Sequence, residues 1–401
     1  MDLRSGHPFW LVKNGLIDTY PPLETDLTCE VVVIGGGITG ALVTYQLAQE
    51  GVDVVVLDKR DIAWGSTSAS TAMLQYEIDK ELHELSTIVG KAQAVRSYRL
   101  GVEALDRLEE ITAEIGAEEN FCRVESIYAT RYKRHLRRLQ TEYAARKESG
   151  LQVRYIERAE LAERYGIDAQ AAIVSAEGAT TDAYVLTYAL FARSRALGAR
   201  IFDRSEVTKL VQHSDGVEVQ TDRNCILRAA KVVFATGYET QQYLQQKITD
   251  LHATFALVSE PTALAQQINQ RYLLWETARP YFYLRATTDN RLILGGGDEP
   301  FHNPEKRDRL IAKKSQQLLK LFHQFYPTFP PPEIAYAWAG TFGETADGLA
   351  YIGESPEVPN AYFALGYGGN GITYSVIAAR IITDLYLGRP NGDVQLFRFC
   401  R

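Results

Sequence analysis

Three glycines near the start of the chain have a spacing suited to binding a phosphate-containing ligand. Gly35, Gly37 and Gly40 follow the β-branched run of residues 29–34 and precede an apolar, helically spaced pattern over residues 41–50. In a strand-turn-helix unit, the first glycine permits the tight turn and the second lets the backbone approach a pyrophosphate. The third lets the helix pack closely on the strand. The helix N-terminus then presents N–H groups and the positive end of its dipole to the phosphates.

Asp58 stands at the end of the next β-branched run, residues 52–57, and completes a β-turn-helix-β unit. A carboxylate at this place accepts hydrogen bonds from both ribose hydroxyls of a dinucleotide, and it repels a 2′-phosphate, which disfavours NADP. A bare GxGxxG pattern also occurs in ordinary glycine-rich turns. The two strands, the helix and the acid together predict a dinucleotide-binding site.

Three further segments are suited to hold a large ligand beside this unit. Residues 65–71 form a hydroxyl-rich loop that could donate N–H and O–H groups, although a mobile linker has the same composition. A buried strand ends at residues 235–237, and the strand of residues 362–365 runs through the glycines of residues 366–371 into a helix. Either one large ligand meets both helix N-termini, or the two units bind two ligands. A dinucleotide with an electron-poor ring fits, because a helix N-terminus stabilises negative charge on the reduced ring.

The composition is that of a globular protein with a large core. The chain has 401 residues, of which 46% are hydrophobic and 23% charged. Its net charge of −7 disfavours binding to a polyanion such as nucleic acid. The four cysteines, Cys29, Cys122, Cys225 and Cys400, lie far apart without metal-ligand spacing. A disulfide framework and a metal site are therefore not expected, and a reducing cytoplasm fits this pattern.

The chain is expected to be soluble and to lack a signal peptide or membrane span. Its first residues have no apolar run of the kind that a signal peptide needs. Residues 31–49 and 361–379 are uncharged and long enough to consider as spans. Both windows are rich in glycines and hydroxyl side chains, whereas a spanning helix is more uniformly apolar.

Five motifs together resemble the FAD-dependent oxidoreductases of the D-amino-acid oxidase superfamily. They are residues 33–40 (VIGGGITG), 64–67 (WGST), 235–237 (ATG), 291–297 (RLILGGG) and 366–371 (GYGGNG). Within this superfamily the sequence is similar to the group of glycine oxidase, sarcosine oxidase and gamma-glutamylputrescine oxidase. The resemblance implies an α/β protein. A Rossmann-like FAD-binding domain is built from discontinuous segments and joined to an α+β substrate domain with a large mixed sheet.

The resemblance also implies domain boundaries and cofactor contacts. The FAD-binding domain is expected over residues 28–90, 151–248 and 336–390, and the substrate domain over residues 91–150 and 249–335, after an N-terminal arm of residues 1–27. The residues expected to contact FAD are Gly35, Gly37, Ile38, Thr39, Gly40, Asp58, Lys59, Gly65, Ser66, Thr67, Ser68, Val207, Ala235, Thr236, Gly237, Gly368, Gly369, Asn370, Gly371 and Ile372. Non-covalent FAD is expected, because residues 338–344 contain no cysteine and residues 65–71 no histidine. Asn370 replaces a histidine found in several relatives.

Candidate substrate residues lie on a predicted hairpin and beside the flavin loops. Alternation puts Tyr281, Tyr283 and Arg285 on one face of a strand, where Arg285 could hold a substrate carboxylate or pair with a structural acid. Gln75, after the hydroxyl-rich loop, and Tyr367, at the expected flavin edge, are further candidates, and each could instead serve in core packing or loop capping. Met73, Tyr76 and Asn370 complete this set. Glu344 and Asp347 could bind a substrate ammonium or simply be solvated, so the sequence does not choose between amino acid and amine.

The resulting hypothesis is an FAD-dependent oxidoreductase that oxidises a C–N bond of a small amine or amino acid. A hydride passes from the carbon beside the nitrogen to flavin N5, and an imine results. Oxygen or an electron carrier would then reoxidise the flavin. Two alternatives are an NAD-linked dehydrogenase and a flavin-binding scaffold or sensor without catalytic activity. Subunit number is not encoded in any motif of this chain.

Overall fold

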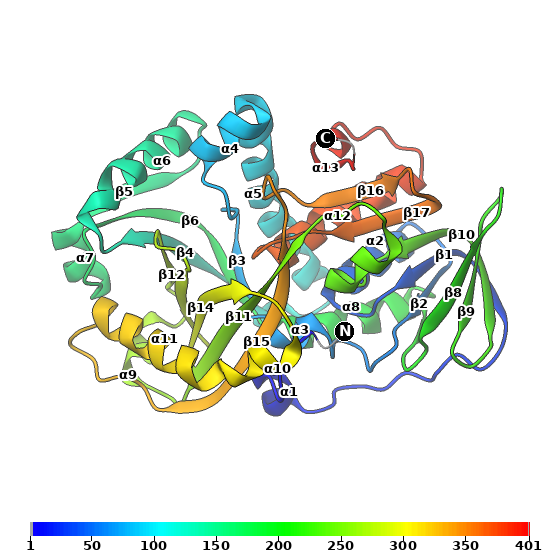
Figure 1. Ribbon diagram of the computed structural model, residues 1–401, viewed down its shortest axis with the longest axis horizontal. Coiled ribbons are helices and arrows are strands. Elements are labelled where there is room, and N and C mark those ends of the chain that lie inside the picture. The colour runs from blue at the N-terminus through cyan, green and yellow to red at the C-terminus, as the bar shows by residue number, and fades with distance from the viewer. Residues whose placement is uncertain (1–2, 400) are drawn as a thin grey trace.

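Two sheets organise the computed structural model, which describes residues 3–399 and 401 (Figure 1). The first sheet has the strand order β16-β17-β10-β1-β2-β7, and β9 and β8 extend it from β10. Its strands are β1 (Leu27–Ile34), β2 (Val54–Leu57), β7 (Arg200–Phe202), β8 (Val207–Gln212), β9 (Val217–Thr221), β10 (Ile226–Phe234), β16 (Tyr351–Ser355) and β17 (Val358–Leu365). Segments from both ends of the chain therefore meet in one sheet.

The central strand β1 is parallel to both β10 and β2, and its second half is buried on both faces. Val31 and Val33 pack in a core with helices on one side, whereas Val32 and Ile34 pack on the other side with the β8–β9 hairpin. Because neither face meets water, the strand is a continuous β-branched run and does not alternate with polar residues. Helix α2 (Ile38–Gln49) follows it and packs between α8 (Ala183–Ala196) and α12 (Gly371–Tyr386).

The second sheet is mixed and has the order β15-β11-β14-β13-β12-β4-β6-β3, with β5 paired to β6. Its strands are β3 (Met73–Gln75), β4 (Phe121–Thr130), β5 (Val153–Glu157), β6 (Ala171–Thr181), β11 (Asp250–Ser259), β12 (Tyr272–Glu276), β13 (Phe282–Ala286), β14 (Leu292–Pro300) and β15 (Ile334–Glu344). Helix α11 (Ile311–Phe325) covers it with Leu318, Phe322 and Phe325, which share one helical face.

The remaining helices connect or cover the two sheets (Figure 1). They are α1 (Phe9–Asn14), α3 (Ser66–Ala69), α4 (Leu82–Val89), α5 (Lys91–Glu114), α6 (Leu136–Glu148), α7 (Arg158–Tyr165), α9 (Ala263–Ile268), α10 (Pro304–Arg309) and α13 (Val394–Phe397), with short 3-10 turns at Glu118–Asn120, Lys133–His135 and Gly237–Tyr243. The long helix α5 contacts α12 of the first sheet's layer and β3 and β6 of the second sheet.

The strand pairing differs from the expected domain division at three places, because β3, the pair β5–β6 and most of β15 were expected in the FAD-binding domain but pair in the second sheet. Residues 151–181 were expected in the FAD-binding domain, but β5 and β6 pair with each other, and β6 pairs with β4 in the second sheet. Backbone hydrogen bonding to β4 decides this, and β4 lies far earlier in the chain. We therefore propose that the return to the FAD-binding domain follows β6.

The described part of the N-terminal arm pairs with the second sheet and contains a helix. The Ser5 N–H donates to the carbonyl of Ala339 at 2.9 Å, and the Thr341 N–H donates to the carbonyl of Leu3 at 3.0 Å, so the arm adds to the edge of β15. Helix α1 follows. The arm then reaches the first sheet's layer, where the Leu23 N–H donates to the Ser205 hydroxyl at 2.8 Å. The arm thus joins both halves of the molecule.

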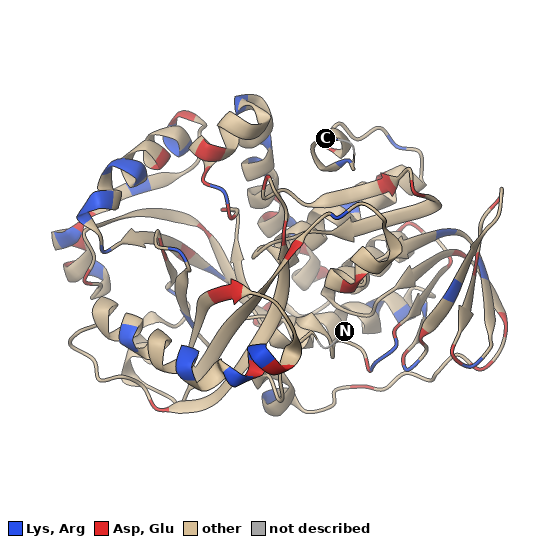
Figure 2. Ribbon diagram, viewed as in Figure 1, with Lys and Arg blue, Asp and Glu red and all other residues tan. Residues whose placement is uncertain are grey.

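The described residues also show the character of the helices, the state of the cysteines and the distribution of charge. Among the residues that the structure describes, no helix combines the length and apolar character needed to cross a membrane. Cys29, Cys122 and Cys225 are free thiols, and Cys400 lies outside the described residues. Figure 2 shows both signs of charge in both halves of the molecule, in keeping with the small net charge of −7.

Candidate functional site

A cavity of about 840 Å³ lies between the two sheets. Strand ends and loops of the first sheet line one part of it, from Gly35 at the end of β1 to Gly371 at the start of α12. Strands of the second sheet line the other part, including Tyr283 on β13 and Trp338 on β15. The cavity is therefore large enough for an extended ligand that contacts both sheets.

The turn between β1 and α2 has the conformation that its glycines predict. Gly35 has a φ of +110°, and a Cβ added there would stand 2.5 Å from the carbonyl oxygen of Ala235. A Cβ on Gly40 would collide with the carbonyl oxygen of Gly35. The N-cap residue of α2, Gly37, has no side chain, and Gly37, Ile38 and Thr39 line the cavity, so the positive end of the helix faces it.

Asp58 is held at the carboxyl end of β2 by two backbone donors. The Gly36 N–H donates to Oδ2 at 2.6 Å and the Arg60 N–H donates to Oδ1 at 2.7 Å. Burial raises the pKa of the Asp58 carboxyl to about 6, although these two hydrogen bonds oppose the shift. The neighbouring Lys59 lines the cavity and forms an ion pair with Glu239 at 2.9 Å.

The hydroxyl-rich segment after Asp58 is a short helix, α3, and not a mobile linker. Its Thr67 hydroxyl accepts a hydrogen bond from the Ile38 N–H at 2.9 Å, which fixes α3 against the start of α2. The Ser68 hydroxyl instead donates to the Gly65 carbonyl at 3.0 Å, and Ser68 does not line the cavity.

The C-terminal glycine loop completes the same cavity. The Gly369 N–H donates to Asp79 Oδ2 at 2.9 Å, and Gly368 has a φ of +54°. The Asn370 amide donates to the carbonyls of Gln75 at 3.2 Å and Glu77 at 2.7 Å. These bonds bring the start of α12 and the segment after β3 to the wall of a cavity that α2 also faces. One ligand can therefore contact both helix N-termini.

Several buried polar atoms of the wall lack a partner among the described residues. They are Ser66 Oγ, Gln75 Nε2, Glu77 Oε2, Asp298 Oδ1 and the Tyr367 hydroxyl. Buried polar groups are normally hydrogen-bonded, so such a set indicates a polar ligand. Two helix N-termini, a carboxylate positioned for ribose and these atoms together fit a dinucleotide such as FAD.

Comparison with known proteins decides the family. The model of the DAO family, described as FAD dependent oxidoreductase, matches residues 30–385. The chain belongs to this family. It is 27% identical over 402 residues to the gamma-glutamylputrescine oxidoreductase of Escherichia coli (strain K12), covering 94% of this chain and 88% of the relative. It is 23% identical over 364 residues to the glycine oxidase of Geobacillus kaustophilus (strain HTA426), covering 89% and 92%.

Solved structures show the same fold. Glycine oxidase from Geobacillus kaustophilus matches with a TM-score of 0.80 at 21% identity, over 94% of this chain and 99% of that chain. L-proline dehydrogenase from P. horikoshii matches with a TM-score of 0.79 at 20% identity, over 93% and 97%. The predicted family, its FAD cofactor and the α/β fold with a Rossmann-like domain and a large mixed sheet are confirmed.

The predicted site residues of this DAO-family protein lie in one place, with four exceptions. All of them line the cavity except Gly40, Ser68, Tyr76 and Arg285. Gly40 contributes by allowing α2 to approach Gly35, as its role in the motif requires. Of the other candidates, Met73 and Glu344 line the cavity, whereas Asp347 is bound by Arg401 at 2.7 Å.

Arg285 does not occupy the position expected of a carboxylate anchor. Its guanidinium donates to the carbonyls of Thr71 at 3.2 Å, Ala72 at 2.7 Å and Thr181 at 2.8 Å, and it lies over the ring of Trp10. Burial lowers the pKa of Arg285 to about 10. Arg285 lies on the same face of β13 as Tyr283, as the alternation predicts. At that end of the strand, however, α1 and the segment before β3 cover this face and contact Arg285. We therefore propose a structural role for Arg285 in place of the expected substrate contact.

The part of the cavity beside the second sheet contains charged residues that the motifs did not identify. Asp79, Asp298 and Arg279 line it together with Glu344, and His252 lies near Glu344 at 3.7 Å. The guanidinium of Arg279 lies 4.8 Å from the ring centroid of Tyr281 and donates to the Asp79 carbonyl. The one sequence signal for Asp298 was its position directly after the glycines of residues 295–297.

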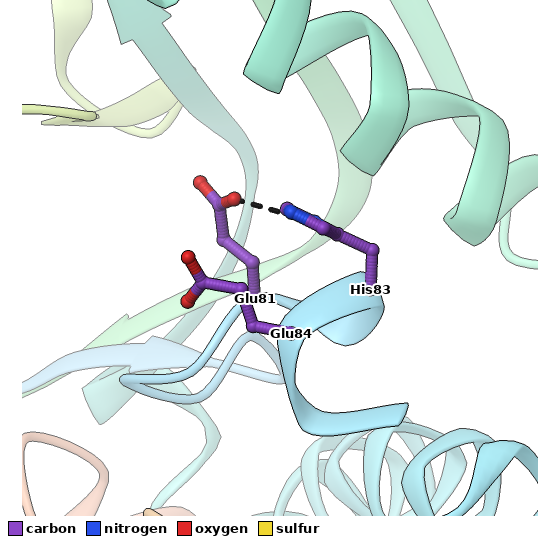
Figure 3. A group of neighbouring side chains, drawn as sticks. All are labelled: Glu81, His83 and Glu84. Carbon is purple, nitrogen blue, oxygen red and sulfur yellow. Dashed lines mark ion pairs between the residues drawn. The ribbon is translucent and has the colours of Figure 1, made fainter. Parts of the chain in front are cut away.

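A cluster of Glu81, His83 and Glu84 near α4 has ligand atoms within 4.8 Å of one another (Figure 3). These groups already have charged partners. His83 Nδ1 lies 3.4 Å from Glu81 and 2.9 Å from Glu142. Arg138 pairs with Glu81 at 2.8 Å and with Glu84 at 3.3 Å. The cluster is an ion-pair network that holds α6 against the start of α4.

Proposed function

We propose that this protein oxidises the C–N bond of a small amine or amino acid and gives an imine. The observation that carries the proposal is the division of one cavity into two parts. The part beside the first sheet suits FAD, and the part beside the second sheet offers acids, one arginine and aromatic rings to a second, small molecule. The relatives named above are an oxidoreductase of gamma-glutamylputrescine and an oxidase of glycine, which supports a nitrogen-containing substrate.

The chain's own residues bind, orient and shield the reactants. The chemistry that FAD supplies when bound is acceptance of a hydride from the carbon beside the nitrogen. Gly37, Asp58 and Gly371 would hold its phosphates and ribose, and the N-terminus of α12 would stabilise negative charge on its reduced ring. Tyr283 and Trp275 wall the substrate part and limit the entry of water.

Charge in the substrate part favours a cationic group. Asp79, Asp298 and Glu344 contribute three acids, and Arg279 contributes one cation that already lies 3.8 Å from Glu344. A substrate ammonium gains from this surplus of acids, whereas a substrate carboxylate meets a single arginine. Arg279 is therefore the candidate anchor for a carboxylate in place of Arg285.

FAD attachment is proposed to be non-covalent. No cysteine is present among the described residues that line the cavity, which supports this proposal. The flavin should accordingly be released by acid precipitation of the protein, and a flavin that stays with the precipitate would contradict the proposal.

The test is an absorbance spectrum of the purified protein followed by anaerobic titration with glycine, sarcosine, D-alanine, proline and putrescine. A yellow protein whose flavin absorbance is bleached by at least one of these compounds supports the proposal. A protein that binds no flavin but forms NADH would favour the NAD-linked alternative. A yellow protein that none of them bleaches would favour the non-catalytic alternative. The rate at which the reduced flavin is reoxidised in air is then compared with its rate of reoxidation by an electron-accepting dye. The faster reaction identifies oxygen or an electron carrier as the acceptor.

A further inference from the structure

A β-bulge in β14 directs one acid toward the substrate part of the cavity. Ala253 of β11 pairs with Glu299 and Phe255 pairs with Gly296, so Thr254 alone stands opposite the two residues Gly297 and Asp298. Gly297 has a φ of +69°, which a residue with a side chain rarely adopts. A bulge of this kind reorients the side chain that follows it, and bulges are enriched next to active sites.

Asp298 carries an unused acceptor. Its Oδ1 atom is buried and has no hydrogen-bond partner among the described residues, although the residue lines the cavity. A buried carboxylate oxygen without a donor is costly, so the arrangement is suited to a donor that arrives with a ligand. Burial raises the pKa of the Asp298 carboxyl to about 6, and the hydroxyl of Thr254 opposes the shift.

The charged neighbours of Asp298 leave this acceptor available. Lys314 of α11 lies behind the bulge, where it donates to the Gly297 carbonyl at 2.6 Å and pairs with Glu299 at 2.7 Å. The acids that act on Asp298 through their charge are Asp79 and Glu344. The other titratable or charged groups of this part of the cavity are His252 on β11, Arg279 before β13, Tyr281 and Tyr283.

We propose that Asp298 binds the cationic nitrogen of the substrate and accepts its proton. This inference rests on the proposed oxidation of a C–N bond. The N–H bond of the substrate ammonium breaks, an O–H bond forms on the Asp298 carboxylate, and the electron pair stays on nitrogen. The neutral amine can then lose a hydride from its carbon to the cofactor, as proposed above. Asp298 thereby lets an amine that is protonated in solution enter the site as an ammonium cation. The amine then reacts in its neutral form.

The first test measures binding without turnover. tert-Butylamine has no hydrogen on the carbon beside nitrogen, so it binds as an ammonium but cannot be oxidised. Its dissociation constant is measured from the perturbation of flavin absorbance in the FAD-loaded protein at pH 8 and pH 5. We expect affinity to fall about tenfold at pH 5, because the carboxyl, with a pKa of about 6, is then mostly protonated. Equal affinity at the two pH values would overturn the proposal.

The second test compares Asp298→Asn with Asp215→Asn, a matched change in an exposed turn between β8 and β9. Asp298→Asn should retain the flavin spectrum, bind tert-butylamine about 10- to 100-fold more weakly at pH 8 and lose the pH dependence. Asp215→Asn should behave as the wild type. Wild-type affinity and pH dependence in Asp298→Asn would refute the proposal. If this variant does not fold, the wild-type titration decides alone.

The two proposals fail in different ways. Wild-type flavin that none of the five amines and amino acids reduces would overturn the proposed function and, with it, the role of Asp298. Wild-type flavin that is reduced, together with an Asp298→Asn variant whose reduction rate has an unchanged pH profile, would overturn only the role of Asp298. In the expected result, the rate of flavin reduction in Asp298→Asn no longer changes with pH near 6. The variant then oxidises only amine that is already neutral in solution.

Discussion

Replacing Arg285 by methionine separates a structural arginine from a substrate anchor. Methionine keeps much of the length of the side chain but has no donors, so the four backbone carbonyls that accept from the guanidinium, those of Thr71, Ala72, Thr181 and Ala286, lose their partner. A hydrogen bond to a charged group contributes about 1.5–3 kcal/mol, but removal of the buried charge recovers part of the total. A net loss of about 3–5 kcal/mol is expected, a large part of a typical free energy of unfolding of about 5–15 kcal/mol.

The assay is thermal unfolding of the FAD-saturated protein, combined with kinetics on glycine and putrescine. Arg285→Met should lower the unfolding midpoint by about 4–6 °C and change KM equally little for both compounds. Arg279→Met is the matched control, because Arg279 lines the cavity and its side chain is 41% exposed. This control should change KM for glycine and leave the midpoint nearly unchanged. An unchanged midpoint with a raised KM for glycine alone in Arg285→Met would refute the reasoning.

Three further predictions concern the cofactor end and the buried ion pairs. Gly40→Ala should retain less flavin and lower the free energy of unfolding by about 1–3 kcal/mol, because the added Cβ collides with Gly35. In the control Gly392→Ala, the added Cβ meets nothing within 4 Å, so bound-flavin absorbance and the melting temperature should match the wild type. Asp58→Asn should weaken FAD binding about tenfold in a flavin-fluorescence titration, because an amide has one acceptor oxygen where the carboxylate uses two. An unchanged affinity would show that Asp58 does not bind the ribose. Burial opposes ionisation of Glu142, but the charge of Arg146 and hydrogen bonds hold its pKa at about 2, below its usual 4.5. Because the pKa is lower in the folded state, the ionised Glu142 stabilises the fold by on the order of 3 kcal/mol above pH 4.5, and this stabilisation is lost as the pH falls toward 2. In Glu142→Gln the free energy of unfolding, followed by circular dichroism, should therefore depend less on pH between 4.5 and 2.

The cofactor end of the site was predictable because local backbone geometry specifies it. The turn at Gly35 needs a positive φ, and the approach of α2 needs a residue without Cβ at Gly40. Both requirements act within a few residues and select glycine wherever this unit occurs. The position of Asp58 follows from the end of the next strand. Residues adjacent in sequence therefore revealed the ligand class.

The substrate end was decided by contacts between distant residues. Alternation along β13 placed Arg285 on the expected face, but Trp10 and the segment near Thr71 cover it, and no pattern around residue 285 announces them. Asp298 enters the cavity because two residues of β14 stand opposite one residue of β11, a register that appears only when the strands pair. Sequence periodicity determines which way a side chain points from its own strand. The packing of other segments determines whether that direction leads to solvent, to a carbonyl or to a substrate.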